Sequence, residues 1–236
     1  MGILVLGRGV AAALMSITIS MSGPTVCPLT SGMSFLGSGG TSSGVYQLTA
    51  NTVLKESIGT VSSAALLENE CRILKRLEAA RVKNVVRCLS ECFVAASGRP
   101  ALVLAPFIDQ RNQDADSMPL NSKTALEVIR AVTQSLVVAH VASSDLQLIK
   151  DGDSVVLIDW DQAKSWEEDS ELPEALVRSF LQEAFSLIPA DDQGQAAGRR
   201  SLAEAIVEIE RERPGLMASQ PKLSAILDSF VEVEGM

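Results

Sequence analysis

The stretch that decides the fold is Val155-Val-Leu-Ile-Asp-Trp-Asp-Gln-Ala163. It is an apolar run that ends abruptly in a carboxylate, an aromatic residue and a second carboxylate. The apolar run predicts a buried strand, and an acid at the end of such a strand is typical of a functional site. Asp-Gly within Lys150-Asp-Gly-Asp153, with Leu146-Gln-Leu-Ile149 before it, predicts a hairpin that leads into this strand. Asp159 is therefore the first candidate for a site residue.

The charge balance limits the classes of partner. Twenty basic and 29 acidic side chains give a formal net charge of −9, which argues against a general nucleic-acid surface and against an anchor for anionic membranes. A hydrophobic content of 47% is ordinary for a globular chain of 236 residues. Any polyanionic ligand must therefore be held by local charges.

Cysteine and histidine usage narrows the metal chemistry. Four cysteines, without C-x-x-C spacing and at low density, predict reduced thiols. We expect a cytoplasmic location. The single histidine, His140, excludes a zinc site with several imidazoles. We expect oxygen ligands for any bound metal. The cysteines are Cys27, Cys71, Cys88 and Cys92.

The first 22 residues are mostly apolar and small, but Arg8 interrupts them. The apolar run that remains is shorter than the roughly 20 residues that cross a bilayer, so we expect no stable membrane insertion. A weak signal peptide, with Arg8 as its basic flank, is the alternative.

Strand and helix patterns follow one another in a fixed order. Alternation and apolar runs predict strands at 45–48, 53–56, 87–94 and 101–108, and helical spacing predicts helices at 62–77, 124–140, 173–187, 198–211 and 222–231. A polar hinge at 109–116 divides the two sets, and 193–198 reads as a surface loop. This order predicts an α+β fold in two lobes. Its parts are an apolar extension at 1–30, an N-terminal lobe at 31–109 and a shortened, mostly helical C-terminal lobe at 110–236.

Leu36-Gly-Ser-Gly-Gly-Thr-Ser-Ser-Gly-Val-Tyr46 resembles the glycine-rich loop G-x-G-x-x-G-x-V of protein kinases. Glycines there let backbone N–H groups approach phosphate oxygens. The match departs by one residue: either Ser42 replaces the third glycine, or one residue is inserted and Gly44 serves. The resemblance implies phosphate contacts at Gly37, Gly39 and Gly44. A plain flexible loop is the alternative.

Lys55 and Glu70 have the family's spacing. In protein kinases a lysine of the third strand neutralises the α- and β-phosphates, and a helix glutamate holds that lysine in an ion pair. Lys55 follows Gly37 by 18 residues, and Glu70 follows Lys55 by 15. The resemblance implies that both residues serve nucleotide binding. The alternative is that Lys55 is a solvated residue at a strand end and Glu70 an exposed charge on a helix.

Leu102-Val-Leu-Ala-Pro-Phe-Ile-Asp109 looks like the strand and hinge that receive the adenine in this family. The resemblance implies that backbone groups of Ala105 and Phe107 bind the base and that Leu104 is the gatekeeper. An ordinary buried edge strand is the alternative.

Asp159 matches the aspartate of the kinase D-F-G motif, here Asp-Trp-Asp. The resemblance implies that Asp159 coordinates Mg²⁺ bridging the phosphates of ATP and that Trp160 packs as the phenylalanine does. The same segment is similar to that of aminoglycoside and choline phosphotransferases, which share the kinase fold. It therefore supports the fold better than it supports a protein substrate.

Ala139-His-Val-Ala-Ser-Ser-Asp-Leu-Gln147 departs from the family. Active kinases have an aspartate as base and, five residues later, an asparagine for the metal. If Asp145 is the base, the residue five positions on is Lys150. If Asp145 replaces the asparagine, the base position falls on His140. One catalytic residue is lost in either register, and the loop is about seven residues shorter than the family pattern.

These features favour a pseudokinase-like domain that binds ATP and Mg²⁺, transfers phosphate poorly or not at all, and acts through an unidentified protein partner. One alternative is an active serine/threonine protein kinase or small-molecule phosphotransferase with Asp145 as catalytic base. Another is an interaction domain that binds no nucleotide, in which Asp145 only caps its loop and His140 only ends a helix.

Overall fold

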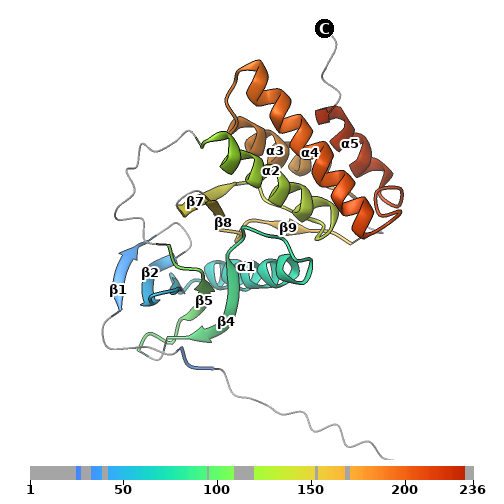
Figure 1. The fold of residues 1–236 in the computed structure, drawn as a ribbon. Coiled ribbons are helices and arrows are strands. Elements are labelled where there is room, and N and C mark those ends of the chain that lie inside the picture. Colours follow the sequence, from blue (N-terminus) through green and yellow to red (C-terminus); the bar gives the residue numbers. More distant parts are fainter. Residues whose placement is uncertain are drawn as a thin grey trace, which may run out of the picture.

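The computed structural model describes residues 25–27, 33–38, 42–94, 96–108, 120–151, 154–167 and 171–231. Within them the fold is mixed α/β, with an antiparallel sheet and one helix in the N-terminal part and a mostly helical C-terminal part (Figure 1). The strands are β1 (Ser34–Gly37), β2 (Ser42–Thr49), β3 (Thr52–Ser57), β4 (Arg87–Phe93), β5 (Pro100–Ala105), β6 (Val141–Ala142), β7 (Gln147–Asp151), β8 (Ser154–Ile158) and β9 (Lys164–Ser165). The helices are α1 (Val61–Ala79), α2 (Ser122–Val137), α3 (Glu174–Ser186), α4 (Asp192–Glu212) and α5 (Pro221–Val231).

The N-terminal sheet has the order β1-β2-β3-β5-β4, and all its neighbours are antiparallel. Successive side chains of a strand point to opposite faces, so β5 serves two cores. Leu102 and Leu104 belong to the main core with α1, whereas Ala101 and Val103 belong to a smaller core on the other face. Lys55 pairs with Leu102 and therefore lies on the α1 face.

Helix α1 packs on β4 and β5. Thr60 caps its N-terminus by accepting a hydrogen bond from the Ser63 amide at 3.2 Å. Apolar positions of the helix, among them Leu67 and Leu74, are buried against the sheet. Glu70 is buried within the same face, so its carboxylate requires a partner inside the protein.

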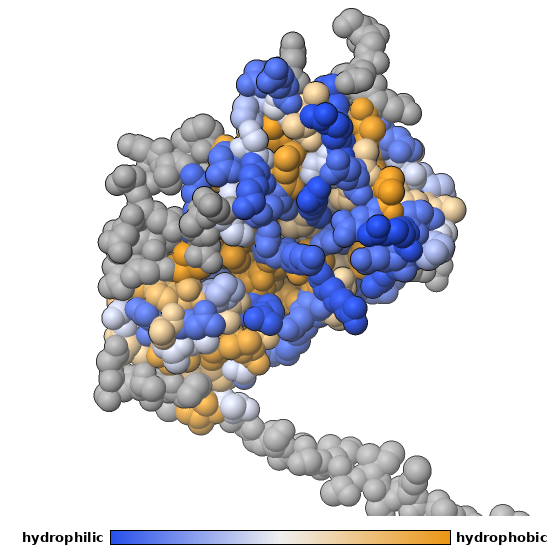
Figure 2. Space-filling model, in the orientation of Figure 1, coloured by the Kyte–Doolittle hydropathy of each residue, from blue (hydrophilic) through white to orange (hydrophobic). Residues whose placement is uncertain are grey.

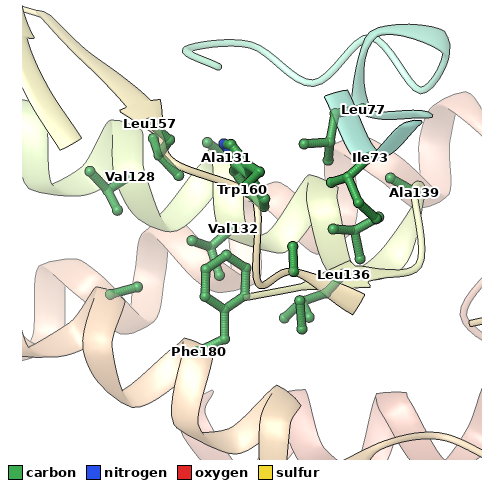
Figure 3. Packing of buried hydrophobic residues seen from close by; sticks show 14 of the residues in the cluster. Ile73, Leu77, Val128, Ala131, Val132, Leu136, Ala139, Leu157, Trp160 and Phe180 are labelled. Carbon is green, nitrogen blue, oxygen red and sulfur yellow. The ribbon is translucent and has the colours of Figure 1, made fainter. Parts of the chain in front are cut away.

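Strand β8 joins the two parts. The Leu157 amide donates to the Asn84 carbonyl at 2.7 Å, and the Val86 amide donates to the Leu157 carbonyl at 3.0 Å. Trp160 follows this strand and is buried, in edge-to-face contact with Phe180 of α3. Figure 3 shows side chains from α1, α2, α3 and β8 converging on Trp160. The segment after β8 is therefore anchored in the main core.

The four cysteines form two disulfides, Cys27–Cys92 and Cys71–Cys88, so the prediction of reduced thiols is wrong. Their Cα atoms lie 5.0 and 5.3 Å apart, which is within the range of a disulfide. The partners are 65 and 17 residues apart in the sequence. No local spacing motif reveals such pairs, because only the folded sheet and helix bring them together.

Residues 193–198 are also not the predicted surface loop, because they form the first turns of α4. Asp191 caps this helix and accepts from the Gly194 amide at 2.6 Å. A Cβ atom on Gly198 would collide with Ile188 Cδ1. Gly198 therefore lies within a helix and close to the Ile188 side chain, not in a turn.

On the face drawn in Figure 2, hydrophilic residues cover much of the helical part, and hydrophobic surface gathers over the sheet. No helix among the described residues is long and apolar enough to cross a membrane. The predicted extension at 1–30 is described only at Thr25–Cys27, and the predicted boundary at Asp109 lies outside the described residues.

Candidate functional site

A cleft of about 360 Å³ lies between the N-terminal sheet and the β7–β8 hairpin. Its volume and apolar lining are within the range of small-molecule sites. Val45 and Lys55 pair across β2 and β3, and Val53 and Leu104 pair across β3 and β5. The cleft is lined by Leu36, Gly37, Ser38, Ser42, Val45, Val53, Lys55, Glu70, Val86, Leu104, Pro106, Phe107, Ile108, Ile149, Ile158 and Asp159.

One end of the cleft is charged. Lys55 Nζ lies 2.8 Å from Glu70 Oε2 and 2.6 Å from Asp159 Oδ1. The predicted ion pair between Lys55 and Glu70 is therefore present, and Asp159 joins it from 104 residues along the chain. The Lys55 and Glu70 side chains are 10% and 1% exposed, whereas that of Asp159 is 30% exposed and open to the cleft.

The cluster has more negative than positive charge. Burial lowers the pKa of Lys55, but the Glu70 and Asp159 carboxylates outweigh burial and the net pKa is raised, so Lys55 stays protonated. Burial raises the pKa of Glu70, and the Lys55 ammonium opposes this only in part. Asp159 and Asp161 add further negative charge close to Glu70. The Lys55 ammonium thus contacts two carboxylates.

The backbone at Asp159 is unusual. Its φ is 58°, in the left-handed region that residues with a Cβ avoid, although Asp and Asn tolerate it best. Such conformations persist only where the surroundings enforce them, and they cluster at functional sites. Here the buried Trp160 follows directly and holds the turn from the core.

The predicted phosphate-loop glycines have different surroundings. Gly37 lines the cleft, and a Cβ atom placed on it would meet nothing within 4 Å. Gly44 lies in β2 outside the cleft lining, and a Cβ on it would be 2.6 Å from the ring of Tyr46, which would have to move. Gly39 lies outside the described residues.

The predicted adenine hinge is partly engaged within the protein. The resemblance to protein kinases assigns backbone groups of Ala105 and Phe107 to the adenine. The Phe107 amide, however, donates to the Asn51 carbonyl at 2.9 Å. Ala105 ends β5 and is buried, and the peptide bond between Ala105 and Pro106 is cis. Phe107 and the predicted gatekeeper Leu104 both line the cleft.

Asp145 lies in the short loop 143–146 between β6 and β7. Gln147 Nε2 donates to Asp145 Oδ2 at 2.6 Å, and the Asp145 amide and carbonyl both contact the Ser143 hydroxyl. Asp145 is not among the described residues that line the cleft. Its carboxylate is thus held by the first residue of β7.

His140 is buried with a φ of 52°, and its ring stacks on Trp166 with centroids 5.8 Å apart. Its carbonyl accepts from the Trp166 amide at 3.1 Å. The ring lines a different hollow, beside the start of α5. The structure therefore does not bring His140 to Lys55 and Asp159.

Sequence reasoning missed a polar face of α1 that holds the segment after Asp159. Asn69 donates to two carbonyls of this segment, Arg72 donates to the Ser165 hydroxyl at 3.0 Å, and Arg76 donates to the Trp166 carbonyl at 3.0 Å. These residues recur at helical spacing along one face. That spacing was the available signal, but polar residues on a helix more often face solvent.

The donor set fits Mg²⁺ only together with phosphate oxygens. No group of three or more His, Cys, Asp or Glu residues that could hold a metal ion is found in the described part of the chain. Mg²⁺ is commonly held by one or two carboxylates plus substrate phosphates. Asp159, partly exposed at the charged end of the cleft, fits that role.

No protein-family model matches this sequence, and a search of curated proteins finds no relative.

Proposed function

We propose that this chain is a protein-kinase-like domain that binds ATP with Mg²⁺ and transfers phosphate poorly or not at all. The observation that carries the proposal is the meeting of Lys55 with both Glu70 and Asp159 at one end of an apolar cleft. These are the three residues that the resemblance to protein kinases implies for ATP and Mg²⁺.

Each part of the cleft suits one part of the nucleotide. The apolar residues of β2, β3, β5 and the β7–β8 hairpin would hold a flat purine base between two walls. Lys55 would contact the phosphates, Glu70 would orient Lys55, and Asp159 would hold the metal. Mg²⁺, when bound with ATP, supplies the positive charge that offsets the phosphates.

The charge balance at the cleft end predicts dependence on the metal. Lys55 carries one positive charge, and it already contacts two carboxylates. A triphosphate added alone would bring its own negative charge close to the carboxylates of Glu70 and Asp159. We therefore expect ATP to bind far more weakly when Mg²⁺ is removed.

The loop at 143–146 supports impaired transfer. A base must come within about 3 Å of the hydroxyl proton that it removes. The Asp145 carboxylate instead accepts a hydrogen bond from Gln147 and lies outside the cleft lining. On this reading, nucleotide binding changes a surface that a protein partner recognises.

One observation favours an active phosphotransferase as the second candidate. Gln147 pairs with Ile158, so Asp145 and Asp159 leave the same end of the β7–β8 hairpin. A modest movement of the loop could turn Asp145 toward a substrate bound next to the phosphates. In that case Asp145 is the base and Asp159 alone organises the metal.

Thermal unfolding with ligands tests the proposal. MgATP at a hundred times its dissociation constant should stabilise the wild type by about 2.7 kcal/mol, which raises the Tm of a domain this size by about 5 to 10 °C. Lys55→Ala and Asp159→Asn should abolish this rise, and ATP with EDTA should give little of it. Lys75→Gln, at an exposed ion pair with Glu91, is the matched control and should respond as the wild type does.

The outcomes separate the candidates. A wild type that no adenine nucleotide stabilises would overturn the proposal and leave an interaction domain that binds no nucleotide. Binding without release or transfer of the terminal phosphate supports the pseudokinase. Phosphate transfer that Asp145→Asn abolishes would establish the active enzyme instead.

The compartment also has to be reconsidered. We expected a cytoplasmic location, where thiols are kept reduced, but all four cysteines are paired. Structural disulfides persist mainly in oxidising compartments. We therefore infer that the chain acts in an oxidising compartment, where MgATP and a protein partner would have to be present.

A further inference from the structure

Three consecutive residues of α1 hold three different parts of the molecule. Asn69 Nδ2 donates to the Asp161 carbonyl at 2.9 Å and to the Ala163 carbonyl at 3.0 Å. Glu70 binds Lys55 of β3. Cys71 is joined by its disulfide to Cys88 of β4. The turn after Asp159, the lysine strand and the sheet edge are thus all tied to one turn of helix.

Helix geometry makes these three ties complementary. With 3.6 residues per turn, successive side chains point about 100° apart, so three of them cover roughly 200° of the helix circumference. A rotation of α1 that preserved one tie would break the others. The disulfide fixes the helix against β4, and from that fixed position Asn69 reaches the turn.

The Asn69 amide has a defined orientation. Arg72 Nη2 donates to Asn69 Oδ1 at 2.6 Å, and Arg72 Nη1 donates to the Ser165 hydroxyl. Arg72 can only donate, so the amide oxygen must face it. The amide nitrogen then faces the two carbonyls of the turn, and an inverted amide would lose all three hydrogen bonds.

The turn that Asn69 holds is the one that sets Asp159. Asp159 has the left-handed φ of 58°, and the Asp161 and Ala163 carbonyls lie two and four residues further on. We propose that Asn69 is a positioning residue that keeps the Asp159 carboxylate aimed at Lys55 and at the metal of a bound nucleotide. This role rests on the proposed function, because it concerns the metal-binding half of the same site.

Asn69→Asp is the decisive variant. It keeps the side-chain size but replaces the two donors with an oxygen that faces two carbonyls, so the turn should loosen. We expect the affinity for MgATP to fall roughly tenfold or more, as two lost hydrogen bonds imply, while the affinity for adenosine stays within about twofold. Lys75→Gln lowers the net charge by the same amount on the same helix and should change neither affinity.

Hydrogen exchange provides a readout that needs no ligand. The Ala163 amide donates to the Trp160 carbonyl, and the Trp166 amide donates to the His140 carbonyl. Both amides should exchange faster in ligand-free Asn69→Asp than in the wild type or Lys75→Gln. If Asn69→Asp does not fold, Asn69→Ala removes the donors without adding charge and takes its place.

Four results would overturn this role. Unchanged exchange at Ala163 and Trp166 means that Asn69 does not hold the turn. Equal losses of MgATP and adenosine affinity mean that Asn69 is merely structural. A wild type that binds adenosine and MgATP equally well leaves no metal contact for Asn69 to position, whereas a wild type that binds neither refutes the proposed function itself and this role with it.

Discussion

Two aspartates leave the same end of the β7–β8 hairpin, and their surroundings are opposite. Asp159 follows β8, takes a left-handed backbone conformation and lies 2.6 Å from the buried Lys55. Asp145 precedes β7, and its carboxylate accepts a hydrogen bond from Gln147 two residues away. Long-range contacts define the first residue and local contacts define the second. A carboxylate's place along a strand therefore does not decide its role, whereas its partners do.

Removing the Lys55 ammonium should have the largest effect on the free energy of unfolding. Lys55→Ala leaves Glu70 buried without its ammonium, and breaking a buried pair typically costs about 3 to 5 kcal/mol. The double variant Lys55→Ala with Glu70→Gln removes both charges of the buried pair and should be more stable than the single variant. Urea unfolding of both checks this. The exposed pair of Lys75 and Glu91 is the control, and Lys75→Ala should cost less than about 1 kcal/mol.

Removing the Cys71–Cys88 disulfide, beside Glu70, should have the next largest effect on the free energy of unfolding. Cys71→Ser with Cys88→Ser opens a loop of 17 residues and should lower the free energy of unfolding by about 3 kcal/mol. Urea unfolding measures the loss, and thiol titration of the denatured, unreduced wild type should find no free thiol. Detection of four free thiols in protein from its natural source would contradict the pairing.

The dependence on pH tests the burial of Glu70. Its folded pKa is raised above the ordinary value of 4.5, so the folded state holds the proton more tightly than the unfolded chain does. The resulting stability is fully present below pH 4.5 and is lost as the pH rises through the folded pKa, at about 1.4 kcal/mol per pH unit of difference between the two.

The comparison with Glu70→Gln isolates this effect. The stability of the wild type minus that of Glu70→Gln, from urea unfolding at several pH values, should decrease as the pH rises above 4.5. A difference that increases with pH would show that Lys55 lowers the pKa of Glu70 more than burial raises it.

Substitution of Asp145 should have the smallest effect, both on the free energy of unfolding and on the affinity for MgATP. Asp145→Asn removes one charge from an exposed position in the loop 143–146 and should change the free energy of unfolding by less than about 0.5 kcal/mol. The affinity for MgATP should stay unchanged, in contrast to Asp159→Asn. Calorimetric titration of both variants makes the comparison, and a large loss of affinity in Asp145→Asn would remove the distinction between the two aspartates.

Much of the fold could be predicted from local patterns. The apolar run of β5 and the helical spacing of Ile73, Leu74 and Leu77 in α1 both gave the right elements, because both patterns reflect burial, on two faces for β5 and on one face for α1. Residues 193–198 were missed, because their glycines indicated a turn. In the folded chain Gly198 lies close to the Ile188 side chain, which is a tertiary contact.

The candidate site was predictable in part. The spacing of Lys55 and Glu70 indicated the ion pair that the structure contains. Asn69 was not predicted, because a polar residue on a helix gives no sign of which distant carbonyls it will reach. The occupied amide of Phe107 was also beyond prediction, since its partner Asn51 lies in a separate turn.

The sequence by itself determined the order of strands and helices and the residue types that could serve a phosphate and a metal. These properties depend on side-chain chemistry and on repeats within a few residues. Only the tertiary structure decided that Asp159 meets Lys55, that Asp145 does not line the cleft and that the cysteines pair. Contacts between residues far apart in the chain depend on how buried faces pack together, and no local pattern encodes that packing.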